Sequence, residues 1–118
     1  MTNQRSIPKP QGIFIDGDWR PSLSGKSIDA IAPAEGLAFA SIAAGNAADI
    51  DAAVTVARKA KETGPWGLLD AVERGRLLAE LGQAILDHAD ELTLLEARDC
   101  GKPLKQARAD IIACARYF

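Results

Sequence analysis

Short apolar runs separated by turn residues fill the first part of the chain. The run at residues 13–15 meets Asp16-Gly17 and resumes two residues later. This pattern is typical of a two-residue hairpin, because both central turn positions favour positive φ. Two further strands are predicted near residues 28–31 and 37–43. Counting the hairpin region as the first strand, we expect three strands in one small antiparallel sheet.

Apolar residues spaced three or four apart dominate the rest of the chain and predict helices. Asn46 can cap a helix start, and Asp49 then lies at the positive end of the helix dipole. Asp70 followed by Glu73 has the form of a capping box. Gly101 is typical of a helix end. The predicted helices cover residues 46–63, 70–89, 90–100 and 103–118.

These elements predict an α/β fold in which a β arm precedes four helices. The arm covers residues 13–45, with its strands inside about 13–43, and residues 1–12 are expected to form a flexible tail. The apolar face of the last helix runs to Phe118 without a glycine or a polar tail. We therefore expect residues 13–118 to be an incomplete domain, the front part of a longer protein.

Composition changes the picture mainly by exclusion. The 118 residues are 47% hydrophobic and 25% charged, which is the balance of an ordinary globular domain and excludes a disordered linker. No apolar run approaches the roughly 20 residues that cross a bilayer, and no signal peptide opens the chain. The formal charge of −2 predicts no nucleic-acid or membrane partner. Two cysteines are too few for a disulfide framework, so we expect a cytoplasmic protein with reduced thiols.

Familiar catalytic patterns are missing from the sequence. It contains neither a P-loop nor the glycine spacing of a dinucleotide fingerprint, and one histidine with two distant cysteines cannot build a zinc site. We interpret His88 as a surface residue and Cys114 as a packing residue of the last helix. Cys100 lies at a helix C-terminus, which raises a thiol pKa and disfavours a nucleophile.

Asp99 is the residue for which the sequence predicts a positively charged partner. Leu92, Leu95 and Asp99 follow one another at helical spacing, so the carboxylate is expected to share a buried face. A buried anion near a helix C-terminus needs compensating positive charge. Arg98, Lys102, an arginine elsewhere in the fold or a bound cation can each supply it.

Several segments, taken in order, resemble the NAD(P)-dependent aldehyde dehydrogenase family. Each is weak alone, and their order over about residues 13–118 carries the resemblance. Ala32 and Glu35 depart from the asparagine and threonine that the family has in its I-N-P-A-T-G segment. The segments are FIDGDW at 14–19 with SGK at 24–26, IAPAEG at 31–36, ADIDAAV at 48–54, Trp66, ERGRLL at 73–78, LEARDCGKP at 95–103 and DI at 110–111.

The resemblance implies a fold with a Rossmann-like cofactor domain and the oxidation of an aldehyde to a carboxylic acid with NAD or NADP. It implies that the family's nucleophilic cysteine, activating glutamate, oxyanion-hole asparagine and glycine-rich cofactor turn all lie beyond residue 118. No catalytic and no cofactor-binding residue is therefore assigned in this chain, which would contribute scaffold. The family also implies a homodimer or homotetramer.

Resemblance to the betaine aldehyde dehydrogenases implies a monovalent cation site, for K⁺ or Na⁺. The matching ligands are the backbone carbonyls at Ala30 and Ile31 and the carboxylate of Asp99. Hard oxygen ligands suit an alkali cation. This site and an ordinary ion pair remain alternatives for Asp99.

Two other functions stay open at this stage. The chain could be a non-catalytic helical interaction module, or a regulatory remnant that assembles with full-length subunits, through an exposed face over residues 104–118. Reading the coding sequence past Phe118 separates these from the enzyme.

Overall fold

The computed structural model describes residues 11–118, which form two compact units. The first unit holds residues 11–31 and Glu35–Gly67, and the second holds Ala32–Ala34 and Leu68–Phe118. The expected tail over residues 1–12 lies almost wholly outside the described residues.

A tight hairpin opens the first unit. Strand β1 (Ile13–Ile15) pairs antiparallel with β2 (Asp18–Arg20), and Ile15 lies opposite Asp18. Asp16 and Gly17 have φ values of 58° and 81°, the positive values that a two-residue turn requires. Ile15 is buried. The hairpin predicted from Asp16-Gly17 is therefore confirmed.

A second two-stranded sheet is formed by β3 (Ser27–Ala32) and β4 (Leu37–Ala43). The prediction of three strands in one sheet is therefore wrong for the described residues, which contain four strands in two sheets. Gln11, two residues before β1, bonds to β4 through its own N–H and C=O, at 2.9 Å to Ser41 and 2.8 Å from Ala43. This contact is an isolated one-residue bridge, which is too short to join the hairpin and β4 into one sheet.

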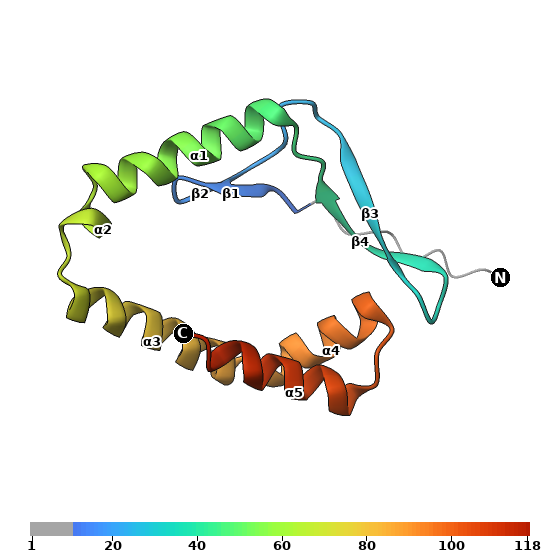
Figure 1. The fold of residues 1–118 in the computed structure, drawn as a ribbon. Coiled ribbons are helices and arrows are strands. Elements are labelled where there is room, and N and C mark those ends of the chain that lie inside the picture. Colours follow the sequence, from blue (N-terminus) through green and yellow to red (C-terminus); the bar gives the residue numbers. More distant parts are fainter. Residues whose placement is uncertain (1–10) are drawn as a thin grey trace. The chain divides into compact units, whose positions relative to one another are not determined.

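The long helix of the first unit, α1 (Ala47–Glu62), runs along the hairpin (Figure 1) and contacts β1. Asn46 and Asp49 begin it with a reciprocal capping box. The sequence predicted a helix over 46–63, so its extent is confirmed to within a residue or two. A four-residue helix that was not predicted, α2 (Pro65–Leu68), follows it.

Three helices form most of the second unit: α3 (Ala71–Asp87), α4 (Ala89–Cys100) and α5 (Leu104–Ala115). Asp70 and Glu73 form the predicted capping box at the start of α3. Gly101 ends α4 with a left-handed φ of 69°. The expectation that the last helix runs to Phe118 is wrong, since α5 ends at Ala115.

Small residues make the contacts among these three helices, and α5 packs against both α3 and α4. Ala107 is fully buried and Ala115 nearly so. A methyl group added to Gly82 in α3 would lie 2.7 Å from the Ala115 carbonyl oxygen, so the two backbones nearly touch. The face of α5 that was expected to be uncovered is therefore partly covered inside its own unit, although Leu104 and Phe118 remain about half exposed.

Within residues 11–118, no helix is both long enough and apolar enough to cross a membrane.

Candidate functional site

A buried carboxylate organises the first unit. Asp49 is only 2% exposed, and its two oxygens accept hydrogen bonds from the Ser22 hydroxyl at 2.8 Å, the Asn46 N–H at 2.9 Å and the Leu23 N–H at 3.1 Å. These donors lower the pKa of Asp49, with the Asn46 N–H as the largest cause. The sequence predicted its position at the start of α1 but not its bonds to the loop after β2.

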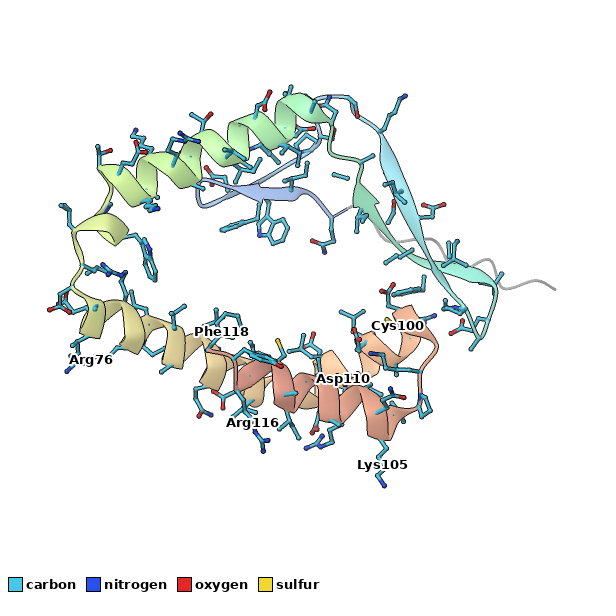
Figure 2. The ribbon with its side chains drawn as sticks, in the orientation of Figure 1. Arg76, Cys100, Lys105, Asp110, Arg116 and Phe118 are labelled. Carbon is cyan, nitrogen blue, oxygen red and sulfur yellow. The ribbon has the colours of Figure 1, made fainter. Side chains whose placement is uncertain are left out.

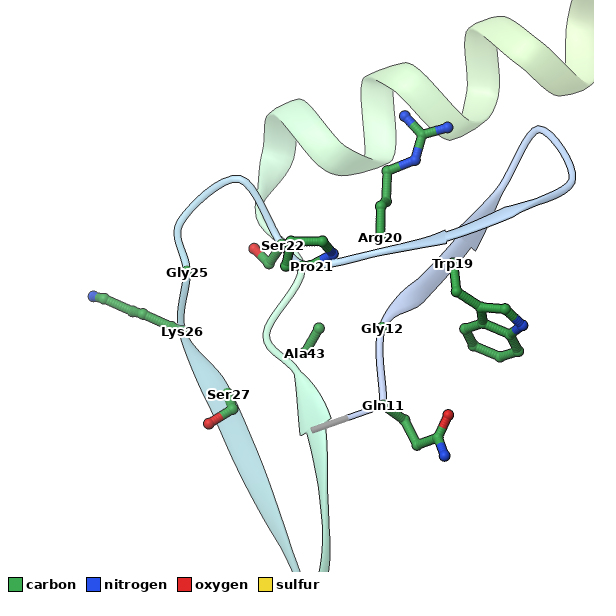
Figure 3. A pocket seen from close by; sticks show the side chains of 10 residues that line it. All are labelled: Gln11, Gly12, Trp19, Arg20, Pro21, Ser22, Gly25, Lys26, Ser27 and Ala43. Carbon is green, nitrogen blue, oxygen red and sulfur yellow. The ribbon is translucent and has the colours of Figure 1, made fainter. Parts of the chain in front are cut away.

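That loop borders an open hollow of about 580 Å³ in the first unit. Figure 3 shows that its polar side chains do not converge, because Lys26 and Trp19 point to opposite sides and Arg20 turns toward α1. The Arg20 guanidinium donates to the Ile15 carbonyl at 2.7 Å. The hollow therefore lacks the convergent polar groups of a ligand site. Its lining residues are Gln11, Gly12, Trp19, Arg20, Pro21, Ser22, Gly25, Lys26, Ser27 and Ala43.

A three-residue ion cluster joins α4 to α5 in the second unit, and we call it the Lys102 triad. Lys102 Nζ lies 2.5 Å from Glu96 Oε1 and 2.8 Å from Asp110 Oδ2. The hydrogen bonds to Asp110 and Glu96 raise the pKa of Lys102 above its usual value. This ammonium is therefore charged at any physiological pH and is unsuited to act as a nucleophile or a base.

Cys100 lies beside the triad at the end of α4 (Figure 2). Its Sγ lies 3.7 Å from Glu96 Oε1. Loss of hydration around the sulfur, followed by the Glu96 charge, raises the pKa of the thiol. The raised pKa agrees with the sequence interpretation that Cys100 is not a nucleophile, although the main cause is dehydration rather than the helix end.

Asp99 does not have the environment that its spacing predicted. It is exposed, and the buried positions of α4 are Ala89 and Thr93 instead. Leu95, which shares the predicted face with Asp99, is itself 53% exposed. Lys102, one of the four alternatives for the partner of Asp99, is paired with Glu96 and Asp110 instead.

The cation ligands implied by resemblance fall in different units. Ala30 is half-buried and Ile31 exposed in β3, while Asp99 lies at the end of α4. Their oxygens have the right chemistry for an alkali cation. Side chains offer no alternative site, since histidine, cysteine, aspartate and glutamate residues within 11–118 nowhere gather in threes that could hold a metal. The cation site stays a prediction.

The two remaining candidate residues both lie on the surface. His88 separates α3 from α4, with its Nδ1 3.6 Å from Glu91 Oε2, which confirms the interpretation as a surface residue. Cys114 is exposed, so its interpretation as a packing residue is wrong. The helical stripe placed it on the face of α5, yet Ala107 and Ala115 make that face's close contacts.

What these residues do together is hold the backbone. Asp49 connects a loop to a helix, and the Lys102 triad connects two helices. Neither places an activated nucleophile beside a general base, as covalent catalysis requires. The geometry of the described residues is that of a scaffold.

Sequence comparison extends this picture. Residues 19–118 match the profile described as "Aldehyde dehydrogenase family". The chain is 39% identical to the mitochondrial aldehyde dehydrogenase family 2 member B4 of Arabidopsis thaliana, over 90% of this chain and 20% of that protein. The chain thus spans about a fifth of this relative.

Solved structures agree with the sequence match. A putative aldehyde dehydrogenase from Burkholderia cenocepacia is 50% identical, with a TM-score of 0.85 over 88% of this chain and 22% of that one. A betaine aldehyde dehydrogenase from Staphylococcus aureus, solved in complex with NAD⁺, is 32% identical, with a TM-score of 0.82 over 86% of this chain and 20% of that one. Sequence profile, relatives and fold agree, and this chain belongs to the aldehyde dehydrogenase family.

Proposed function

We propose that residues 13–118, of which 19–118 match the family profile, form the N-terminal scaffold portion of an enzyme that oxidises an aldehyde to a carboxylic acid with NAD or NADP. The observation that carries the proposal is the family match over residues 19–118. The described contacts support it, because Asp49 and the Lys102 triad fix backbone segments.

In this role the chain holds its helices and strands in position, and residues outside the chain perform the reaction. When bound, the nicotinamide cofactor supplies the hydride acceptor. The family's nucleophile and cofactor loop are expected beyond residue 118, so no residue of the chain is proposed to touch the reacting atoms.

A chimeric enzyme tests this function. Residues 19–118 would replace the matching segment of the Staphylococcus aureus betaine aldehyde dehydrogenase, and aldehyde-dependent NADH formation would be measured. We expect the chimaera to be active and the host without the segment to be inactive. A folded, soluble chimaera that forms no NADH contradicts the proposal and favours an interaction module.

We further propose that Asp99 binds K⁺ or Na⁺ together with the carbonyls of Ala30 and Ile31. The resemblance to the betaine aldehyde dehydrogenases supports this, and Lys102 does not compete for Asp99 because it is engaged with Glu96 and Asp110. Carboxylate and carbonyl oxygens are the donors that hard cations prefer.

The cation proposal predicts a salt-specific effect of Asp99→Asn in the chimaera. The parent should unfold at a higher temperature in potassium chloride than in tetramethylammonium chloride at equal ionic strength, and the variant should lose that difference. Asp87→Asn, at the end of α3, is the matched control and should keep it. A difference that survives in Asp99→Asn excludes Asp99 as a ligand.

For the intact protein, we propose a cytoplasmic homodimer or homotetramer. Two unpaired cysteines support a reducing compartment. Sedimentation of the chimaera measures the assembly state, and a purely monomeric, active chimaera would contradict that part.

A further inference from the structure

In the turn between α4 and α5, one lysine side chain binds carboxylates from both helices. Lys102 lies in this turn, yet its side chain is only 23% exposed, because carboxylates from both helices surround its ammonium. Glu96 comes from α4 and Asp110 from α5. A single side chain thus connects the two helices at their corner.

Helix α5 needs such a contact because its own start is weak. Pro103 precedes it and provides no side-chain cap. The N–H groups of Gln106 and Ala107 both bond to the Pro103 carbonyl at 3.0 Å, so one acceptor serves two donors. The Ala107 bond is the first ordinary bond of the helix, whereas a capping side chain would ordinarily serve an amide at the position of Gln106. The bond from Lys102 to Asp110 reaches past this first turn.

The corner also packs against a distant part of the sequence in the same unit. A methyl group added to Gly101 would lie 3.1 Å from Pro33 Cβ. Ala32, next to Pro33, is 1% exposed. The position of the corner therefore decides how closely the segment Ala32–Ala34 can pack.

We propose that Lys102 is a positioning residue: by binding Glu96 and Asp110 together, it fixes the α4–α5 corner and holds Gly101 against Pro33. This differs from a surface ion pair, which contributes little because water competes for both charges. Here one shielded ammonium serves two carboxylates on two helices. The inference rests on the proposed function only in its use of the chimaera.

Amide hydrogen exchange in the chimaera tests the proposal. Lys102→Met keeps the aliphatic chain and removes the charge. We expect it to speed exchange at Gly101, Gln106 and Ala107 by about tenfold or more, and Lys102→Arg to stay within about threefold of the parent. Lys105→Met, at an exposed lysine in the first turn of α5 (Figure 2), is the matched control and should change these rates less than about twofold.

Two outcomes overturn the proposal. One is unchanged exchange at the corner in Lys102→Met. The other is equal acceleration throughout α3, α4 and α5, which would assign Lys102 a general stabilising role. If Lys102→Met does not fold, Asp110→Asn should speed exchange at Gln106 and Ala107 more than at Gly101, and no change there also overturns it. An inactive parent chimaera would count against the proposed function alone, since exchange reads the corner directly.

Discussion

At the scale of single residues, Asp49 shows how one side chain can hold a loop. Its oxygens accept hydrogen bonds from two segments that are far apart in the sequence. Ser22 and Leu23 lie in the loop after β2, and Asn46 lies at the start of α1. Because the bonds favour the charged form, the pKa of Asp49 lies below the ordinary carboxyl value. A carboxylate of this kind stabilises the fold above its unfolded pKa and loses that effect as pH falls through the folded pKa.

Asp49→Asn should therefore weaken the loop at neutral pH. In the chimaera, protection of the Leu23 and Asn46 amides from hydrogen exchange should fall about tenfold or more at neutral pH. The difference between variant and parent should vanish below the folded pKa of Asp49. Asp51→Asn, an exposed position in the same helix, should leave both amides protected. Equal loss in the two variants would show that Asp49 acts only through charge at the helix start.

Thr93 is the opposite case, a buried polar group that gains nothing from its polarity. The residue is 6% exposed, and its hydroxyl is the one buried side-chain donor among the described residues without a hydrogen-bond partner. Burying an unpaired hydroxyl is unfavourable. We therefore expect the hydroxyl of Thr93 to contribute less to stability than a methyl group of the same size would.

Replacing Thr93 by valine should thus leave the opening free energy of α4 unchanged or raise it by up to about 1 kcal/mol. Hydrogen exchange of the α4 amides measures this quantity. Thr55→Val in α1 removes an exposed hydroxyl that donates to the Asp51 carbonyl at 2.7 Å, and it should not stabilise α1. A loss of more than about 1 kcal/mol on Thr93→Val would mean that the hydroxyl has a partner, such as a water molecule.

At the scale of elements, α3 contains two glycines in different surroundings. A methyl group at Gly75 would meet nothing within 4 Å, whereas one at Gly82 would lie 2.7 Å from the Ala115 carbonyl oxygen. Glycine weakens a helix, and among the described residues a close backbone contact requires it at Gly82 but not at Gly75.

The same substitution should therefore have opposite effects at the two positions. Gly75→Ala should raise the opening free energy of α3 by about 0.5–1 kcal/mol, and Gly82→Ala should lower it by about 1–3 kcal/mol because α5 must move away. Amide exchange in the chimaera measures both. Stabilisation by Gly82→Ala would show that the α3–α5 contact is looser than described.

Short sequence motifs predicted the turns and the helix starts well. They predicted poorly which side chains contact one another across elements. Asp16-Gly17 predicts its hairpin and Asp70 with Glu73 predicts a helix start, because each effect acts within three residues. Helix α2 was not predicted, because four residues are too few to show a periodic pattern. The partners of Lys102 were not predicted, because Asp99 lies nearer in sequence than Glu96 or Asp110. Only the geometry of the α4–α5 corner selects among these carboxylates.

At the scale of the whole molecule, the described residues contain hydrogen bonds and ion pairs that hold the backbone, and exposed apolar side chains. They do not bring a nucleophile and a general base together. Leu104 in α5 and Phe118 just beyond it remain about half exposed, although α5 packs on two other helices. Exposed large apolar side chains are common where a surface meets another part of a protein.

The 118-residue chain alone should neither oxidise an aldehyde nor bind NAD. Its sequence has no glycine-rich phosphate loop, and the pKa of Cys100 is raised rather than lowered. Isothermal titration calorimetry with NAD⁺ should show no saturable heat, with the active chimaera as the positive control. Micromolar binding by the chain alone would mean that the cofactor site lies at least partly within it.

The two capping boxes have a consequence for the order of events during synthesis. Helices α1 and α3 satisfy their first amides with side chains three residues away, so their first turns need no distant partner. Helices α4 and α5 have no side-chain cap, so we expect them to depend more on packing against their neighbours. We therefore expect a growing chain to carry two early helices, followed by a late, cooperative closing step around Lys102.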